Sequence, residues 1–314
     1  MGFPDTVRSI ANRRGFSMTD CTNIKKTDSI EIMLVCDENY GAFMATTIAS
    51  ILKNAEAIDS FRFHIVDCGL KNASREAVDE LKKLRPFEVV YYKHELPEYL
   101  QSTDTPFPAL VYHRLFAARF LPESLEKILY MDVDIVVLSS LRELWNTPLD
   151  GVFAAAAHDR YMSQEHCKAI GIEKKDDYFN AGVLLMNLKY WRENDVVDKL
   201  LNIINEFKEP LSFAEQDLLN IYASRYGYRL VSEKWNVNPR DYVEGQTRLI
   251  HYMGSRRHCP CLDILYGYAA LTKYGRLPMQ RVSYKIKRVV CQFLCLFLIR
   301  HKDRRNLRKR MNIR

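Results

Sequence analysis

Apolar and polar positions alternate between strand-like and helix-like patterns over the first third of the chain. Residues 30–36 form a continuous apolar run that predicts a buried strand, and the mostly apolar segments 61–67 and 87–92 predict two more. Between them, residues 43–53 and 74–84 place apolar side chains at helical spacing. This alternation predicts parallel strands joined by right-handed crossovers, in a sheet whose ligands lie beyond the carboxyl ends of the strands.

The same alternation continues to about residue 275 without a linker. The additional strands that it predicts lie at 127–131, 135–138, 151–157, 179–187 and 248–252. It also predicts three further helices: one that begins near residue 189, one over 200–207 and one over 216–222. We therefore expect an N-terminal extension (1–28), one α/β domain (29–275) and a C-terminal tail (276–314).

Charge is distributed unevenly along the chain. The formal net charge is +7, yet residues 281–314 hold twelve Lys or Arg and one acid, whereas the rest of the chain carries a net charge of −4. A mildly acidic body argues against nucleic acid as a partner.

Apolar residues in the basic tail recur at helical spacing, and the run 289–299 is too short to span a bilayer. The tail therefore predicts a basic amphipathic helix on an anionic membrane surface. A helix packed on the domain with a disordered basic end stays open as an alternative.

The cellular compartment is predicted from the N-terminus and the cysteines. The first residues lack the apolar run of a signal peptide, and none of the eight cysteines forms a Cys-x-x-Cys pair. We expect a reduced, cytoplasmic protein that is associated peripherally with the inner face of the cell membrane.

Two carboxylates follow the predicted strand 127–131. Asp132 and Asp134 are spaced i, i+2, so they point the same way if the chain stays extended. Like charges this close need a counter-ion, and Mn²⁺ or Mg²⁺ with oxygen ligands supplies one that also bridges to phosphate. One Asp capping a turn with the other exposed is the alternative. No Gly-x-Gly-x-x-Gly follows the first strand, which disfavours a dinucleotide-binding oxidoreductase.

Seven short blocks in collinear order, spanning about residues 30–258, resemble glycosyltransferase family 8. The blocks are Cys36-Asp-Glu-Asn-Tyr40, Phe63-His-Ile-Val-Asp67, Tyr112-His-Arg114-Leu, Leu129-Tyr-Met-Asp-Val-Asp134, Tyr178-Phe-Asn-Ala-Gly182, Glu215-Gln-Asp217-Leu-Leu-Asn220 and His251-Tyr-Met-Gly254. The chain is most similar to the bacterial galactosyl- and glucosyltransferases that extend lipopolysaccharide. The resemblance implies an α/β, GT-A (Rossmann-like) nucleotide-sugar-binding fold with a mostly parallel central sheet, a UDP-sugar donor, Mn²⁺, and retention of anomeric configuration.

The resemblance also implies roles for single residues. Asp132 and Asp134 match metal ligands, and His251 matches a third ligand from the far end of the chain. A neutral imidazole suits Mn²⁺, although a satisfied core histidine is the alternative for His251.

Six residues match donor-binding positions. Asp37 and Asn39 match contacts to uracil and ribose, and Tyr40 would lie against the uracil ring. Arg114 matches an arginine, on a helix before the metal motif, that reaches the donor sugar or the diphosphate. Gly254 belongs to the last block, and Arg257 falls where the family has a lysine on the diphosphate. The Pro-Trp that follows in the family is missing.

Four residues match positions around the reacting sugar. Asp159 and Asn180 match side chains that hold donor-sugar hydroxyls. Glu215 and Gln216 match an acidic–Gln pair near the anomeric carbon. The family usually has Asp at the first position of this pair, so Glu215 departs from the family pattern with a longer side chain. Gly182 would allow close approach of the backbone.

These features predict a retaining transferase that moves glucose or galactose from a UDP-sugar to a glycan acceptor, expected to be lipid-linked. Front-face attack is favoured, with Glu215 or Asp159 as a nucleophile in a minority hypothesis. Two alternatives remain. One is a glycogenin-like self-glucosylating protein, which shares the fold and needs an acceptor tyrosine on a mobile loop; with 18 tyrosines, the sequence does not exclude one. The other is a catalytically dead binding or scaffolding descendant.

Overall fold

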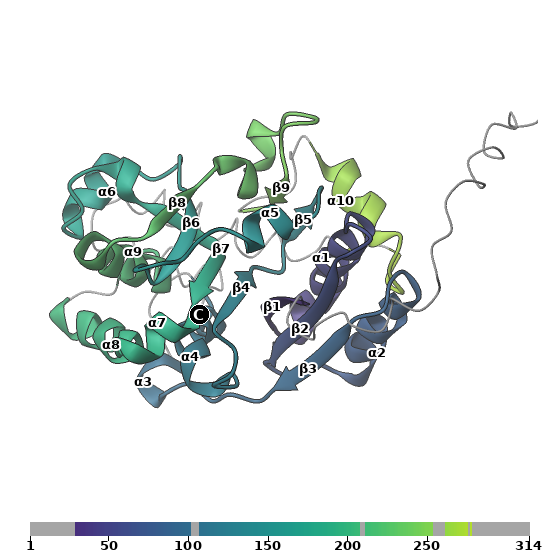
Figure 1. Cartoon of the computed structure of the whole chain (residues 1–314), viewed down its shortest axis with the longest axis horizontal. Helices are drawn as coiled ribbons and strands as arrows, with labels where there is room; N and C mark the ends of the chain where they lie inside the picture. Colours follow the sequence, from purple (N-terminus) through teal and green to yellow (C-terminus); the bar gives the residue numbers. More distant parts are fainter. Residues whose placement is uncertain (1–28, 102–106, 208–210, 254–260, 276, 278–314) are drawn as a thin grey trace, which may run out of the picture.

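A seven-stranded sheet forms the centre of the structure, a computed structural model that describes residues 29–101, 107–207, 211–253, 261–275 and 277 (Figure 1). The strand order is β3-β2-β1-β4-β7-β6-β8. Its strands are β1 (Ser29–Cys36), β2 (Ser60–Asp67), β3 (Glu88–Tyr92), β4 (Lys127–Met131), β6 (Ala154–His158), β7 (Phe179–Asn187) and β8 (Arg229–Val231). A separate two-stranded sheet pairs β5 (Ile135–Val137) with β9 (Leu249–His251).

Short and long helices connect these strands. The α-helices are α1 (Gly41–Lys53), α2 (Asn72–Glu80), α3 (Glu98–Gln101), α4 (Ala117–Phe120), α5 (Arg142–Trp145), α6 (Gln164–Ala169), α7 (Leu188–Glu193), α8 (Val196–Glu206), α9 (Glu215–Tyr226) and α10 (Leu262–Ala269). The 3-10 helices are η1 (Glu38–Tyr40), η2 (Leu81–Lys83), η3 (Ala109–Phe116), η4 (Lys175–Asp177), η5 (Glu233–Trp235) and η6 (Pro239–Asp241).

The central sheet is mostly parallel, as predicted. Strands β3, β2, β1 and β4 pair in parallel, and β6 pairs in parallel with β8. Strand β7 runs antiparallel to both of its neighbours, β4 and β6. The carboxyl ends of β1, β4 and β6 therefore open on the same edge of the sheet, where the acidic residues were expected.

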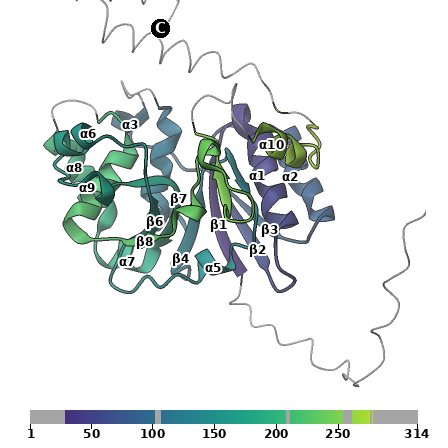
Figure 2. The same ribbon diagram turned by 90° about the horizontal axis from the view of Figure 1, so that it is seen from above.

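Helices cover both faces of this sheet (Figure 2). Successive side chains of β1 explain why both faces are apolar: Ile32 and Leu34 join the core beneath α1 and α2, whereas Met33 and Val35 join the core beneath η3, α7, α8 and α9. A strand with both faces buried reads as a continuous apolar run, which is the pattern seen at 30–36.

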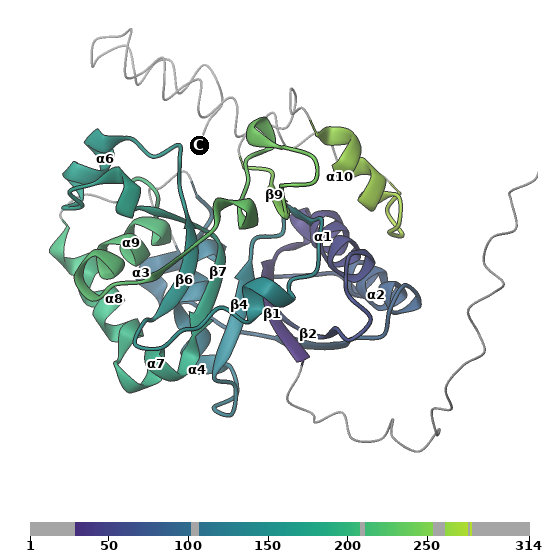
Figure 3. The same ribbon diagram turned by 45° about the horizontal axis from the view of Figure 1, so that its top comes forward.

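The small β5–β9 sheet fixes the chain that follows β4. Thr47 of α1 donates its hydroxyl hydrogen towards the carbonyl oxygens of Val133 and Ile135, each 2.8 Å away. Helix α10 packs beside α1 and closes the same side, with Phe43 and Leu265 in a shared apolar cluster (Figure 3). The loop between β4 and β5 is thereby held against a helix that is buried along most of its length.

Several element boundaries differ from the prediction. The helix expected over 74–84 ends at Glu80 and continues as 3-10 turn η2, and the strand expected from 151 begins at Ala154 because Gly151 adopts φ +70° in a turn. Arg114 lies on a 3-10 helix, η3. The predicted amphipathic helix in residues 276–314 lies outside the described residues apart from Leu277. No helix in the described part of the chain is long and apolar enough to cross a membrane.

Candidate metal and donor-sugar site

Asp132 and Asp134 lie where β4 ends. The backbone amide of Asp132 donates to the carbonyl oxygen of Gly182 on β7, 2.8 Å away, which continues the β4–β7 pairing by one residue. The amide of Tyr252 donates to the carbonyl oxygen of Asp134 at 2.9 Å, so the next segment of the site is bonded directly to this loop.

Strand β9 brings His251 to these carboxylates. His251 pairs with Ile135 in the β5–β9 sheet, and its Nε2 lies 3.5 Å from Asp132 Oδ2 and 3.3 Å from Asp134 Oδ1. One ligand atom from each of the three residues lies within 4.8 Å of the others. Two carboxylates and an imidazole are a suitable donor set for Mn²⁺.

A second layer of amides sets the orientation of the imidazole. Nδ1 of His251 lies 2.9 Å from Asn236 Oδ1, and the Asn236 Nδ2 donates to Asn180 Oδ1 at 2.9 Å. Because the Asn236 amide is fixed in this way, its oxygen accepts a hydrogen from Nδ1. Nε2 of His251 therefore faces the carboxylates, as a metal-binding nitrogen must.

The charges of the cluster are mutually compensating. Burial alone would raise the pKa of Asp132, but the charge of Arg114 and the hydrogen bond with His251 lower it below its ordinary value. Burial alone would lower the pKa of His251, whereas its hydrogen bonds to Asp132 and Asp134 raise it to about 9. A protonated His251 thus balances the two carboxylates, and a divalent cation fits the same place.

Gly182 leaves the space that the cluster occupies. A Cβ at this position would lie 2.1 Å from Cε1 and 2.7 Å from Nδ1 of His251, and 2.9 Å from Oδ2 of Asp132. Such distances are far inside van der Waals contact, so only glycine fits. The sequence predicted a close approach at Gly182, and the side chains that approach it are those of His251 and Asp132.

Arg114 is a buried anchor for Asp132. Its side chain is 3% exposed, and its Nη2 donates to Asp132 Oδ1 at 2.9 Å while Nη1 donates to the carbonyl oxygen of Ala181 at 2.7 Å. The Tyr130 hydroxyl donates to the same Asp132 oxygen at 2.6 Å, with the guanidinium 4.1 Å from the centre of its ring. These contacts leave Asp132 Oδ2 directed at His251. A donor-binding role for Arg114 stays a prediction.

Glu215 lies on the other side of Arg114. Its Oε1 is 3.3 Å from Arg114 Nη2, and within the described part of the chain its buried Oε2 has no hydrogen-bond partner. Burial raises the pKa of Glu215 to about 7 despite the nearby guanidinium. The residue before it, Ala214, adopts φ +51°, a strained conformation at the start of α9.

Asp159, Asn180 and Gln216 form one hydrogen-bonded group. Asp159 Oδ2 accepts from Asn180 Nδ2 at 3.1 Å and from Gln216 Nε2 at 3.3 Å. Gln216 Oε1 accepts from the amide of Ala181 at 3.0 Å. The structure therefore joins these predicted residues to the metal cluster through Asn180 and Asn236.

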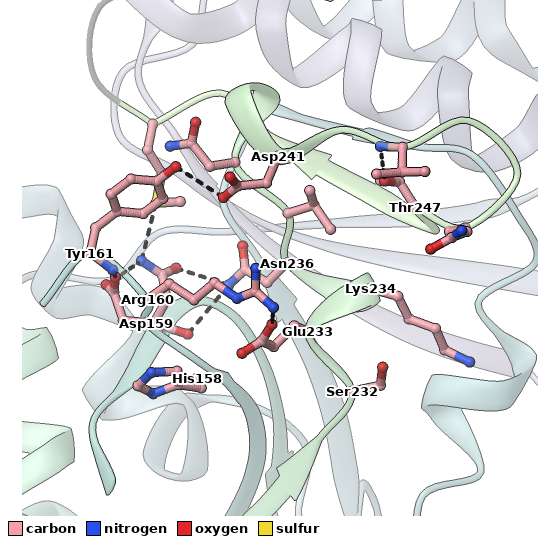
Figure 4. Close-up of a pocket in the computed structure, with 16 residues that line it drawn as sticks. His158, Asp159, Arg160, Tyr161, Ser232, Glu233, Lys234, Asn236, Asp241 and Thr247 are labelled. Atoms are coloured by element: carbon pink, nitrogen blue, oxygen red, sulfur yellow. Dashed lines mark hydrogen bonds and ion pairs between the residues drawn. The ribbon is translucent and has the colours of Figure 1, made fainter. Parts of the chain in front are cut away.

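A pocket of about 350 Å³ opens beside this group (Figure 4). Asp159, Asn180 and Asn236 line this pocket. The other lining residues are His158, Arg160, Tyr161, Ser232, Glu233, Lys234, Val237, Asn238, Asp241, Val243, Gln246, Thr247 and Met253. Among the described residues, the metal cluster and this pocket share the Asn180–Asn236 pair as their common wall.

Asp37, Asn39 and Tyr40 lie beyond the carboxyl end of β1. Asp37 caps η1 by accepting from the amide of Tyr40 at 3.1 Å, and it also accepts from Asn39 Nδ2 at 2.6 Å. Strand β1 neighbours β4, with Met33 opposite Tyr130, so this loop and Asp132 lie at the ends of adjacent strands. Their contacts to a nucleotide stay a prediction.

Two of the predicted site residues are not described by the structure, and two residues that contact the metal cluster were not predicted. Gly254 and Arg257 lie outside the described residues. Asn236 and Tyr130 were not predicted as site residues, although both hold metal-cluster side chains. Asn236 belongs to a segment without periodicity, so only the fold reveals its contact with His251. Tyr130 adjoins the Asp-x-Asp triplet, but it reads as part of the buried strand.

Comparisons with known proteins agree with the resemblance. The profile of Glycosyl transferase family 8 matches residues 31–257. A putative glycosyltransferase of Haemophilus influenzae is 28% identical over 225 residues, which cover 68% of this chain and 65%, less than two thirds, of that protein. The lipopolysaccharide 1,2-glucosyltransferase of Escherichia coli K12 is 25% identical over 254 residues, covering 75% of this chain and 74% of the relative.

The fold has a close counterpart among solved structures. The galactosyltransferase LgtC, solved in complex with donor and acceptor sugar analogues, matches with a TM-score of 0.66 and 22% identity over 82% of this chain and all of LgtC. The predicted α/β, GT-A-type architecture is thereby confirmed for the described residues. A family match over most of the chain shows the relationship directly: this protein is a member of glycosyl transferase family 8.

Proposed function

We propose that this family-8 glycosyltransferase moves glucose or galactose from a UDP-sugar to a lipid-linked glycan, with retention of configuration and with a divalent cation, preferably Mn²⁺. The observation that supports it best is the convergence of Asp132, Asp134 and His251 from two distant parts of the chain. A dead descendant would have no need of the Gly182 space or the Asn236 contact that keep this cluster open and oriented.

The chain's own residues have distinct parts in the proposed reaction. Arg114 keeps Asp132 ionised, and Asn236 keeps Nε2 of His251 directed at the carboxylates. Asp159, Asn180 and Gln216 present oxygen and amide groups for sugar hydroxyls. A cation bound by the Asp–Asp–His cluster would supply positive charge for the diphosphate leaving group.

Front-face attack is the proposed route to retention. Both carboxylate oxygens of Asp159 accept hydrogen bonds, from the amide of Tyr161 on Oδ1 and from Asn180 and Gln216 on Oδ2, which weakens it as a nucleophile. Glu215 has a pKa of about 7, so much of it is protonated at neutral pH. A glycosyl–enzyme adduct trapped on either carboxylate would overturn this route.

The acceptor and the location are proposed from sequence and relatives. Two relatives are lipopolysaccharide 1,2-glucosyltransferases, which supports a lipid-linked glycan as the acceptor. The basic tail, residues 276–314, is proposed to bind an anionic membrane at the cytoplasmic face and to bring domain 29–275 to this acceptor. Unchanged binding to anionic liposomes after deletion of residues 281–314 would contradict the tail's role.

A donor panel tests the proposal. UDP release is measured with UDP-glucose, UDP-galactose and UDP-N-acetylglucosamine, in Mn²⁺ and in excess chelator, for the wild type and for Asp134→Ala. We expect Mn²⁺-dependent release with UDP-glucose or UDP-galactose, lost in Asp134→Ala. Release that survives both chelation and the substitution would refute it. A sugar found on a tyrosine of the chain itself would instead support self-glucosylation.

A further inference from the structure

The loop after β1 carries three predicted nucleotide-binding residues, and its own hydrogen bonds set its shape. Asp37 accepts from Asn39 Nδ2 at 2.6 Å and from the amide of Tyr40 at 3.1 Å. Bonds within one turn fix the form of that turn, whereas its place relative to the rest of the molecule depends on contacts with other segments. Glu38, which lies between Asp37 and Asn39, makes such contacts.

The carboxylate of Glu38 ties the loop to the start of α2. Its Oε2 accepts from the backbone amide of Lys71 at 2.9 Å and from Ser74 Oγ at 2.8 Å. Lys71 is the N-cap residue of α2, and its side chain makes no capping hydrogen bond. A carboxylate at a helix N-terminus is favoured by the helix dipole. The loop and α2 therefore hold each other in place through Glu38.

The turn after α10 extends this contact by one more side chain. Ser74 is fully buried, and its Oγ also lies 2.8 Å from the hydroxyl of Tyr274. An ionised carboxylate only accepts, so the single hydroxyl hydrogen of Ser74 goes to Glu38 and the Tyr274 hydroxyl donates to Ser74. The three side chains thus form one directed series of hydrogen bonds, from Tyr274 through Ser74 to Glu38.

The packing around this series leaves it little freedom. A Cβ at Gly41, the first residue of α1, would lie 2.6 Å from Ser74 Oγ and 3.3 Å from the Tyr274 hydroxyl oxygen. Lys273 forms an ion pair with Glu76 of α2 at 2.8 Å, so the turn is bonded to α2 at two neighbouring positions. Helices α2 and α10 both pack against α1 (Figure 3). The Tyr274 hydroxyl is therefore held in place from its own side as well.

We propose that Glu38, Ser74 and Tyr274 are positioning residues for the uridine part of the donor, because their hydrogen bonds set the place of the Asp37 loop. This inference rests on the proposed function, since it takes that loop as the uridine site. It deepens the proposed function by adding a residue, Tyr274, that lies beyond the segment 31–257 matched by the family profile.

Two ligands separate positioning of the uridine from general damage to the fold. Affinities of the full chain for UDP and for methyl diphosphate, which has the diphosphate but no nucleoside, are measured by calorimetric titration with Mn²⁺. Tyr274→Phe removes one hydrogen bond of the series and weakens UDP binding about three- to ten-fold. Methyl diphosphate binding is expected to stay unchanged, because it depends on the metal cluster and not on the Asp37 loop.

Substitutions of Glu38 test the other end of the series. Glu38→Ala leaves both the Lys71 amide and the Ser74 hydroxyl without their acceptor, so UDP affinity falls about ten-fold or more. Glu38→Gln keeps an acceptor oxygen at the same place and is expected to restore UDP affinity to within about two-fold of the wild type. In the UDP-release assay, Tyr274→Phe raises KM for the UDP-sugar and leaves kcat unchanged.

Tyr268→Phe is the matched control. Tyr268 is a half-buried tyrosine of α10 whose hydroxyl accepts from Asn54 Nδ2 at 2.6 Å. Asn54 follows the carboxyl end of α1, whereas the Asp37 loop precedes its amino end. Removal of this hydroxyl should lower the Tm about as much as Tyr274→Phe does and leave UDP affinity unchanged.

UDP and methyl diphosphate affinities that fall together in Tyr274→Phe and Glu38→Ala would overturn the inference. So would a Tyr274→Phe protein that binds UDP as tightly as Tyr268→Phe does. Binding of UDP by the wild type reports separately on the proposed function. Intact wild-type binding with failed variant predictions therefore refutes the positioning role alone.

Discussion

Replacing Gly182 by alanine tests the packing of the metal cluster. The added Cβ would lie 2.1 Å from His251 Cε1, where carbon atoms normally approach to about 3.5–4.0 Å. The imidazole or strand β7 must therefore move by more than about 1 Å. The ring has little freedom to move, because His251 is 3% exposed and its Nδ1 is bonded to Asn236.

This displacement has two measurable consequences. Overpacking in a buried site costs about 1–3 kcal/mol of unfolding free energy, which lowers the Tm by roughly 5 °C for a domain of this size. Metal sites tolerate ligand shifts of only about 0.2 Å, so the affinity for Mn²⁺ falls by about a hundred-fold or more. A hundred-fold loss of affinity corresponds to about 2.8 kcal/mol, so the two losses are of similar size and are measured separately.

Calorimetric titration with Mn²⁺ in the presence of UDP measures the loss of metal affinity, and thermal unfolding measures the loss of stability. Gly267→Ala is the matched control, because this glycine is exposed on α10 and a Cβ there meets nothing within 4 Å. The control is expected to be neutral or slightly stabilising, as in other helices. A Gly182→Ala protein that binds Mn²⁺ like the wild type would refute the reasoning.

Three other substitutions have defined outcomes. Asn236→Ala removes the acceptor that orients His251 and lowers Mn²⁺ affinity about 10–100-fold in the same titration, and an unchanged affinity would contradict the role given to Asn236. Burial lowers the pKa of His113 from 6.5 to about 4. The stability that the neutral imidazole contributes is therefore present above pH 6.5 and is lost as the pH falls toward 4. Urea unfolding at pH 7.5 and at pH 5 should show a loss of about 2 kcal/mol of unfolding free energy from this residue, and the loss should be absent in His113→Asn. An equal pH slope in His113→Asn would contradict this. Arg192 donates hydrogen bonds to five carbonyl oxygens of residues 118–125. Arg192→Lys should therefore lower the unfolding free energy by about 2 kcal/mol in denaturant titration. An unchanged denaturation midpoint would disprove this prediction.

Local sequence signals predicted the parts of the fold that depend on local pattern. The apolar run 30–36 and the helical spacing of 43–53 gave β1 and α1, because both elements are buried along most of their length. Strand β8 has only three residues, two of them exposed, and therefore carries no usable pattern. The reversal of β7 depends on its pairing with β4 and β6, which no local property of residues 179–187 encodes.

The site divides in the same way. Asp132 and Asp134 stand out because two acids end a buried strand, and the family resemblance added His251 from far along the chain. The contact of Asn236 with His251 joins residues 15 positions apart through a segment without periodicity, so it is visible only in three dimensions. The engagement of Arg114 by Asp132 and Glu215 likewise depends on the packing of η3 against β4 and α9.

Manganese binding to the wild type, Asp134→Asn and His251→Ala tests the central claim most directly. Free Mn²⁺ is counted by its electron paramagnetic resonance signal during titration of the chain with UDP present. The account predicts one tightly bound ion per chain in the wild type and a large loss of affinity in both variants, with circular dichroism spectra unchanged. Equal Mn²⁺ affinity in the wild type and in both variants would contradict the assignment of the Asp–Asp–His cluster as the metal site.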